Sequence, residues 1–126
     1  MRLGIFASVG AVIGSLARYA ISQLVVNNYH GTFPWATLVV NVVGAFFIGL
    51  CARYLSVIND DVRRSFLVTG VLGGFTTFSA LAVESVQLVT DSSQSTIHGA
   101  VIAVLYVILT FVVGICATSF ALGKKQ

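Results

Sequence analysis

Charged residues are scarce in this sequence, and their scarcity excludes most soluble proteins. Only 9% of the 126 residues are charged, whereas 57% are hydrophobic. A soluble globular domain carries about 25% charged residues. The composition therefore predicts an integral membrane protein, organised as a single membrane domain over residues 1–126.

Acidic residues and cysteines are also few, which narrows the possible functions. The four acidic side chains form no cluster within the apolar segments, so a cation pump is poorly supported. Cys51 and Cys116 lie in apolar segments without a Cys-x-x-Cys spacing, which favours buried free thiols over a disulfide or a metal site. No charged tail is large enough to indicate binding to nucleic acid.

Four apolar stretches are long enough to cross a membrane, for which a helix needs about 20 residues. Pro34 fits the first turn of the second stretch, where its missing N–H costs nothing, and Asn59-Asp60-Asp61 closes that stretch. The short linkers predict antiparallel neighbours. We therefore expect an all-α membrane protein with spans at about residues 3–26, 34–57, 64–90 and 96–122.

The basic residues are distributed unequally between the two ends of these spans. His30 and Asp91 lie at one end, and Arg18 lies inside the first span. Cytoplasmic loops carry an excess of Lys and Arg. The distribution predicts a multi-pass protein of the cytoplasmic (inner) membrane with both termini in the cytoplasm. The basic residues at the cytoplasmic end are Arg2, Arg53, Arg63, Arg64, Lys124 and Lys125.

Residues 70–80, Gly-Val-Leu-Gly-Gly-Phe-Thr-Thr-Phe-Ser-Ala, interrupt the third apolar stretch. Three glycines and three hydroxyl residues within these eleven positions weaken a helix. A break at membrane depth is a common way to aim backbone dipoles at an ion. The alternative is a flexible packing helix, since glycine is frequent in membrane helices. We expect the third helix to be broken near its middle.

Small residues also recur at the spacing that lets membrane helices approach closely. Gly10 and Gly14 form one such pair, and Gly70 and Gly74 form another. Four helices of this length enclose little internal volume. We therefore expect a second subunit to complete any conduction path or substrate site.

Four polar residues within the spans are candidates for function. Arg18 can snorkel to the interface or act as a vestibule cation, and Glu84 can have a structural role or transfer protons. Asn41 can bond between helices or line a polar path. Thr110 can bond its own helix backbone.

The polar groups near the predicted break are mostly hydrogen-bond donors. They are accompanied by aromatic rings, whose positive edges can face an anion in a dry passage. Donors and ring edges suit a small anion, whereas carbonyl groups released at a helix break suit a small cation. The residues concerned are Arg18, Asn41, Phe75, Thr76, Thr77, Phe78 and Ser79.

Three motifs in this order resemble a known family, the small four-span fluoride channels called Fluc or CrcB proteins. The first span contains Gly10-Ala-Val-Ile-Gly-Ser-Leu-Ala-Arg18. The second is entered by Gly31-Thr-Phe-Pro-Trp-Ala-Thr-Leu-Val-Val-Asn-Val-Val-Gly44. The third contains Thr69-Gly-Val-Leu-Gly-Gly-Phe-Thr-Thr-Phe-Ser79, followed by Glu84. The resemblance covers essentially the whole chain.

The resemblance implies a channel rather than an enzyme, formed by a dimer of antiparallel subunits with two pores at their interface. Such channels passively export fluoride that enters the cell as hydrogen fluoride. By resemblance, Gly73 and Thr76 offer backbone carbonyls to a structural sodium ion on the dimer axis. Asn41 matches the pore asparagine, Phe78 a pore phenylalanine and Arg18 the arginine on the vestibule side. Thr77, Ser79 and Thr110 supply further hydroxyls to the predicted fluoride path.

The sequence departs from the family pattern at two places. Leu81 stands where a second phenylalanine is expected, and Val107 and Phe111 fall near the places of a serine and threonine pair. A leucine lacks a polarised ring edge. Together with the unequal charge distribution, Leu81 favours a homologous partner chain of reversed charge bias over a second copy of this chain, with one pore degraded.

Two other functions remain open from the sequence. A small multidrug exporter coupled to protons needs a carboxylate within the membrane, and Glu84 is the only candidate. The chain can also be a non-conducting partner subunit of a heterodimeric fluoride channel.

Overall fold

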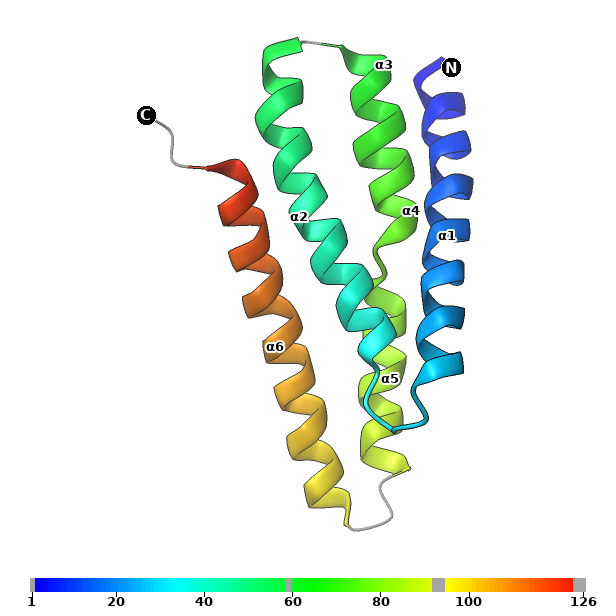
Figure 1. Ribbon diagram of the computed structural model, residues 1–126, viewed down its shortest axis with the longest axis vertical. Coiled ribbons are helices and arrows are strands. Elements are labelled where there is room, and N and C mark those ends of the chain that lie inside the picture. Colours follow the sequence, from blue (N-terminus) through cyan, green and yellow to red (C-terminus); the bar gives the residue numbers. More distant parts are fainter. Residues whose placement is uncertain (1, 59, 92–94, 124–126) are drawn as a thin grey trace.

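The computed structural model describes residues 2–58, 60–91 and 95–123, and all regular secondary structure in these segments is helical (Figure 1). The side chains of residues 56–58 are not described. Asn59, Lys124 and Lys125, which entered the predictions of helix ends and charge, lie outside the described residues.

The four predicted membrane spans are confirmed. The first is α1 (Arg2–Asn28), the second α2 (Trp35–Ile58) and the fourth α6 (Thr96–Leu122). The third consists of consecutive pieces and is apolar enough to cross a membrane over Asp61–Thr90. Its pieces are α3 (Asp61–Arg64), the π-helix η1 (Ser65–Leu72), α4 (Gly73–Phe75) and α5 (Phe78–Thr90).

The helix ends differ from the predicted ones by a few residues for identifiable reasons. The third span begins at Asp61 because the Asp60 carboxylate accepts hydrogen bonds from the backbone N–H groups of Val62 and Arg63, at 3.0 and 3.1 Å. This is N-capping. Pro34 precedes α2, and its carbonyl accepts a hydrogen bond from Leu38 N at 3.3 Å.

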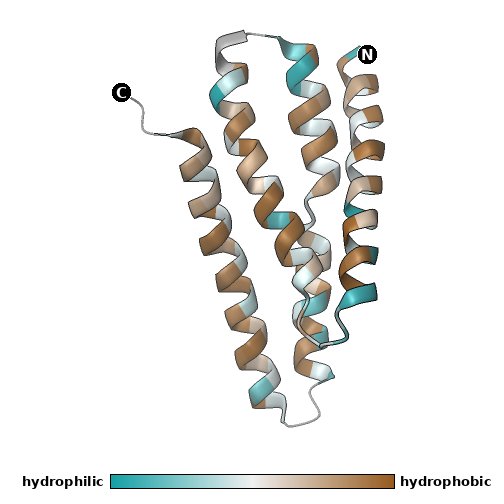
Figure 2. Cartoon of the chain, in the orientation of Figure 1, coloured by the Kyte–Doolittle hydropathy of each residue, from teal (hydrophilic) through white to brown (hydrophobic). Residues whose placement is uncertain are grey.

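The helices pack as two groups of neighbours, α1 with the first half of the third span and α6 with α2 and α5. In Figure 1, α1 runs beside the first half of the third span, while α6 runs beside α2 and, at its other end, beside α5. The start of α1, the end of α6 and the start of α3 lie at one end of the molecule. Apolar colours dominate the helix bodies in Figure 2, as expected for surfaces that contact lipid.

Glycines bring α1 and the third span into backbone contact. A methyl group added to Gly14 would overlap the carbonyl oxygen of Val71, and one added to Gly74 would overlap that of Ala11. A methyl group on Gly70 would lie 2.7 Å from the carbonyl oxygen of Ala7. The glycine pairs expected from the sequence therefore form one tight interface within the chain.

The packing of α2 against α6 uses both small residues and a hydrogen bond. Thr118 Oγ1 donates to the carbonyl of Ala45 at 2.9 Å. A methyl group on Gly49 would lie 2.6 Å from the carbonyl oxygen of Thr118. Val40 and Tyr106 are fully buried, with 0% of their surfaces exposed, so the tightest core lies between these two helices.

Replacement of Gly14 by alanine should destabilise the protein, because the new methyl group forces the backbones of α1 and η1 apart. We expect a loss of about 1–3 kcal/mol in the free energy of unfolding, measured in detergent. Gly4→Ala is the matched control on the same helix, since no atom lies within 4 Å of a methyl group there. Equal stability of the two variants would contradict the tight interface.

Candidate functional site

The third span is interrupted at two threonines rather than at the glycines. Thr76 (φ −73°, ψ 155°) and Thr77 (φ −148°, ψ 114°) are extended, and α5 begins at Phe78. Gly70, Gly73 and Gly74 all remain helical. The glycines serve close packing against α1 at two of these positions, while the change of direction occurs where the threonines begin.

The side chain of Asn41 in α2 spans the interruption with two hydrogen bonds to one residue. Its Oδ1 accepts from the backbone N–H of Thr77 at 2.8 Å, and its Nδ2 donates to the carbonyl of Thr77 at 3.0 Å. Thr77 Oγ1 in turn accepts from Ala80 N at 3.2 Å and caps α5. The N–H and carbonyl of Thr77 and the N–H of Ala80 are thus satisfied inside the protein.

In a continuous helix, two of these N–H groups would donate to backbone carbonyl groups. Here both donate to side chains instead. The N–H of Thr77 would otherwise bond Gly73, and the N–H of Ala80 would bond Thr76. The carbonyl oxygens of Gly73 and Thr76 therefore lose their helical partners, and such oxygens fit a small hard cation such as sodium.

The carbonyl of Gly74, unlike those of Gly73 and Thr76, has hydrogen-bond donors from another helix. It accepts hydrogen bonds from Arg18 Nε at 3.3 Å and Ser15 Oγ at 3.4 Å, both from α1. The sequence left Arg18 open between a snorkelling side chain and a vestibule cation. The structure places its guanidinium against the backbone of the interrupted span.

A groove of about 410 Å³ runs along α2, α5 and α6 at the interruption. Asn41, Thr77, Phe78 and Thr110 line it, and Leu81 contributes to its wall with only 4% of its surface exposed. Thr110 is buried, and its hydroxyl donates to the carbonyl of Tyr106 at 2.8 Å. It therefore bonds the backbone of its own helix, which was one of the roles considered from the sequence.

Arg18 and Ser79 do not line this groove. Ser79 is exposed, with its Oγ 3.2 Å from Thr77 Oγ1, and Arg18 lies on the α1 side of the third span. Phe78 is 72% exposed, so its ring forms an open flank of the groove. The residues predicted for one path thus divide into a groove-lining group and two residues outside it.

Glu84 on α5 accepts two hydroxyl hydrogen bonds that sequence reasoning did not find. Thr37 Oγ1 donates to Glu84 Oε1 at 2.7 Å, and the Tyr106 hydroxyl donates to Oε2 at 2.8 Å. Of the two roles left open for Glu84 by the sequence, these contacts favour the structural one. Two neutral donors from two other helices hold the carboxyl group.

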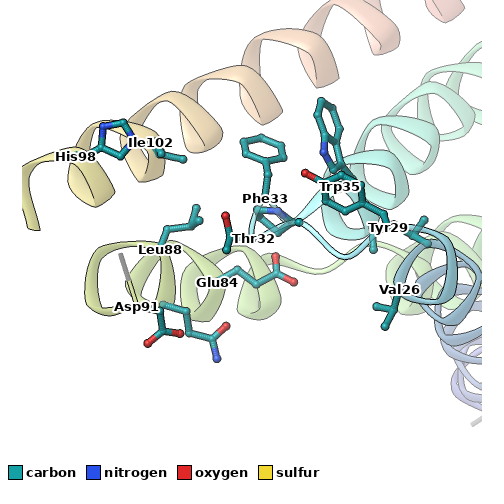
Figure 3. Close-up of a pocket in the computed structure, with 15 residues that line it drawn as sticks. Val26, Tyr29, Thr32, Phe33, Trp35, Glu84, Leu88, Asp91, His98 and Ile102 are labelled. Carbon is teal, nitrogen blue, oxygen red and sulfur yellow. The ribbon is translucent and has the colours of Figure 1, made fainter. Parts of the chain in front are cut away.

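A second cavity, of about 450 Å³, lies where Glu84 meets the segment before α2 (Figure 3). In Figure 3, Phe33 and Trp35 lie on the side of α5 from which Glu84 projects, with Asp91 and His98 farther along. The rings of Phe33 and Trp35 are 4.6 Å apart, and the ring of Phe33 is 5.5 Å from that of Tyr106. These contacts hold the segment before α2 against α6.

The fold and the site define a small multi-pass membrane protein whose third span is interrupted beside a polar groove. Residues 5–122 match the family described as CrcB-like protein, Camphor Resistance (CrcB), and the chain belongs to this family. Several curated relatives match it over most of their length. A protein of Opitutus terrae, named fluoride-specific ion channel FluC, is 40% identical over 116 residues, which cover 89% of this chain and 88% of that relative.

Relatives from other bacteria bear the same name. One from a Roseiflexus species is 41% identical over 123 residues, which cover 94% of this chain and 93% of that relative. One from Agrobacterium fabrum is 38% identical over 120 residues, which cover 92% of this chain and 91% of that relative. The similarity therefore extends over all four spans and includes the interrupted segment.

Removal of the Tyr106 hydroxyl should destabilise the protein, because one oxygen of Glu84 would then lack its donor in a partly buried place. We expect Tyr106→Phe to lower the free energy of unfolding by about 1–3 kcal/mol. Tyr19→Phe on α1, where the side chain is 63% exposed, is the matched control. Equal thermal stability of the two variants would show that this hydrogen bond contributes little.

Proposed function

We propose that the chain is a subunit of a passive fluoride channel, not an enzyme. One observation carries the proposal: the groove at the interruption is lined by an amide, by hydroxyl groups and by an exposed phenylalanine ring. An amide nitrogen has two protons, and Asn41 uses one of them on Thr77, which leaves a donor for an anion. The names of the relatives supply the identity of that anion.

The channel acts as a dimer, with the open side of the groove closed by a second subunit in antiparallel orientation. The carbonyls of Gly73 and Thr76 have lost their helical donors, and Gly73, Phe78 and Ser79 are exposed in the single chain. Polar backbone groups at membrane depth cannot face lipid without a large cost. A second subunit over this face removes that cost and completes the fluoride path.

The second subunit is a homologous chain of reversed charge bias, and the two insert in opposite directions. A chain that inserts both ways needs balanced loops, whereas the basic residues here gather at one end. The same bias supports a location in the cytoplasmic membrane with both termini in the cytoplasm. The leucine at position 81 supports unequal pores, because it offers no ring edge to an anion.

A structural sodium ion is held by the backbone carbonyls of Gly73 and Thr76. Their fit rests on the loss of both helical donors and on the open surroundings of Gly73, where an added methyl group would meet only Val68 O, at 3.7 Å. When bound, the ion supplies positive charge that satisfies carbonyl oxygens at membrane depth. The residues of this chain supply the fluoride path.

Fluoride efflux from liposomes, followed with a fluoride-selective electrode, tests the proposal. The chain coexpressed with a homologue of reversed charge bias should release fluoride, whereas the chain alone should release little. In the assembled channel, Asn41→Ala and Phe78→Ile should each slow release about tenfold or more, because the anion loses a donor or a ring edge.

Matched controls and outcomes separate the parts of this proposal. Asn28→Ala removes an exposed amide bonded within α1, and Phe120→Ile removes a ring that is 80% exposed on α6; neither should slow release. Absence of efflux from the assembled channel would refute the fluoride function. Rapid efflux from the chain alone would refute only the unequal pair. Efflux that withstands both groove substitutions would make this chain a non-conducting partner.

Glu84→Gln separates a passive channel from a proton-coupled exporter. Glutamine can accept from one hydroxyl and donate to the other, so fluoride efflux should stay within about threefold of wild type. An exporter would lose transport completely, since its proton site would be gone. Uphill movement of an organic cation driven by a pH gradient, abolished by this substitution, would establish the exporter instead.

A further inference from the structure

At the interruption, the carbonyl of Gly74 accepts hydrogen bonds from side chains of α1. In a continuous helix it would accept from Phe78 N, but Thr76 and Thr77 are extended before that residue. Ser15 Oγ and Arg18 Nε now converge on this oxygen. Ser15 and Arg18 are three residues apart, so they lie on the same face of α1.

Close backbone contact makes this arrangement possible. A methyl group on Gly74 would overlap the carbonyl oxygen of Ala11, and one on Gly14 would overlap that of Val71. The axes of α1 and the first half of the third span are therefore near enough for a serine hydroxyl to reach the opposite backbone. The guanidinium also lies near the C-terminal end of that half, where a helix favours positive charge.

The neighbouring carbonyls are left for another partner. Gly73 is exposed, a methyl group there would meet only Val68 O at 3.7 Å, and the helical donors of Gly73 and Thr76 go to the side chains of Asn41 and Thr77. If Gly74 were released from α1, its oxygen would join the carbonyls of Gly73 and Thr76 that lack a helical donor. The peptide between Gly74 and Phe75, which adjoins the peptide that carries the Gly73 carbonyl, would then lose the two hydrogen bonds that fix its orientation.

We infer that Arg18 and Ser15 are positioning residues: by holding the Gly74 carbonyl against α1, they fix the segment whose Gly73 and Thr76 carbonyls bind sodium. Arg18 then acts on the cation site through the backbone, and not as a charge that attracts anions at a channel mouth. This inference rests on the sodium site of the proposed function, although its test does not depend on fluoride conduction.

The test is the sodium dependence of thermal stability of the purified, assembled channel. Sodium chloride is titrated against N-methylglucamine chloride at constant ionic strength, and bound sodium raises the unfolding midpoint by mass action. Arg18→Lys keeps the charge but loses the Nε donor, so half-maximal stabilisation should need about tenfold more sodium. Ser15→Ala should need about threefold more, because its hydrogen bond is longer and neutral.

Matched controls have the same chemistry away from the interruption. Arg64→Lys changes an exposed arginine at the start of the same span, and Ser8→Ala removes a hydroxyl that bonds Gly4 within α1. Both should keep the sodium dependence of the wild type. If Arg18→Lys does not assemble, Ser15→Ala alone decides the result by its shift.

The outcomes separate this inference from the proposed function. If Arg18→Lys and Ser15→Ala leave the sodium dependence of the unfolding midpoint unchanged, the inference is overturned. It is also overturned if the unfolding midpoint of the wild-type channel does not depend on sodium. Fluoride efflux by the wild type, measured separately, reports on the channel itself. If Arg18 instead attracts anions, Arg18→Lys leaves sodium dependence and efflux intact, whereas Arg18→Gln raises the fluoride concentration needed for half-maximal flux.

Discussion

The two hydrogen bonds between the Asn41 amide and the backbone of Thr77 are the constraint on which the site depends. An interrupted helix at membrane depth exposes backbone groups that lipid cannot satisfy. One amide supplies both the acceptor and the donor that Thr77 needs, at 2.8 and 3.0 Å. By capturing the Thr77 N–H, it also takes the helical partner from Gly73. A single side chain thus stabilises the interruption and creates a free carbonyl beside it.

The hydroxyl of Thr77 repeats this principle one turn later. It caps α5 through Ala80 N, which removes the helical donor of Thr76. The held carbonyls of Gly74 and Thr77 and the released carbonyls of Gly73 and Thr76 are therefore set by side chains from α1, from α2 and from the N-cap of α5. Gly74 is held by α1, Thr77 by α2, and the start of α5 by its own N-cap. The glycines instead allow α1 to approach closely enough for its side chains to reach the Gly74 carbonyl.

Composition and motif spacing predicted the spans well, because lipid imposes a length and an apolar character that any sequence shows directly. The interruption lies within the eleven residues in which the sequence concentrates glycines and hydroxyl residues, at Thr76 and Thr77, whereas the three glycines there remain helical. The partners of Glu84 could not be predicted. Thr37 and Tyr106 lie 47 and 22 residues away in sequence, and only the packing of α2 and α6 brings them together. Arg18 was ambiguous for the same reason, since its acceptor is a backbone atom 56 residues away.

Assembly and conduction are linked in the proposed channel because they use the same surface. The proposed partner covers Gly73, Phe78 and Ser79, which are exposed in the single chain. That partner also closes the groove lined by Asn41 and Thr110. Leu81 lies in the groove wall and is only 4% exposed, so it contributes packing and no ring edge. Under this proposal, a chain can lose part of its own conduction chemistry and keep the surface that assembles the pair, which accounts for the proposed unequal subunits.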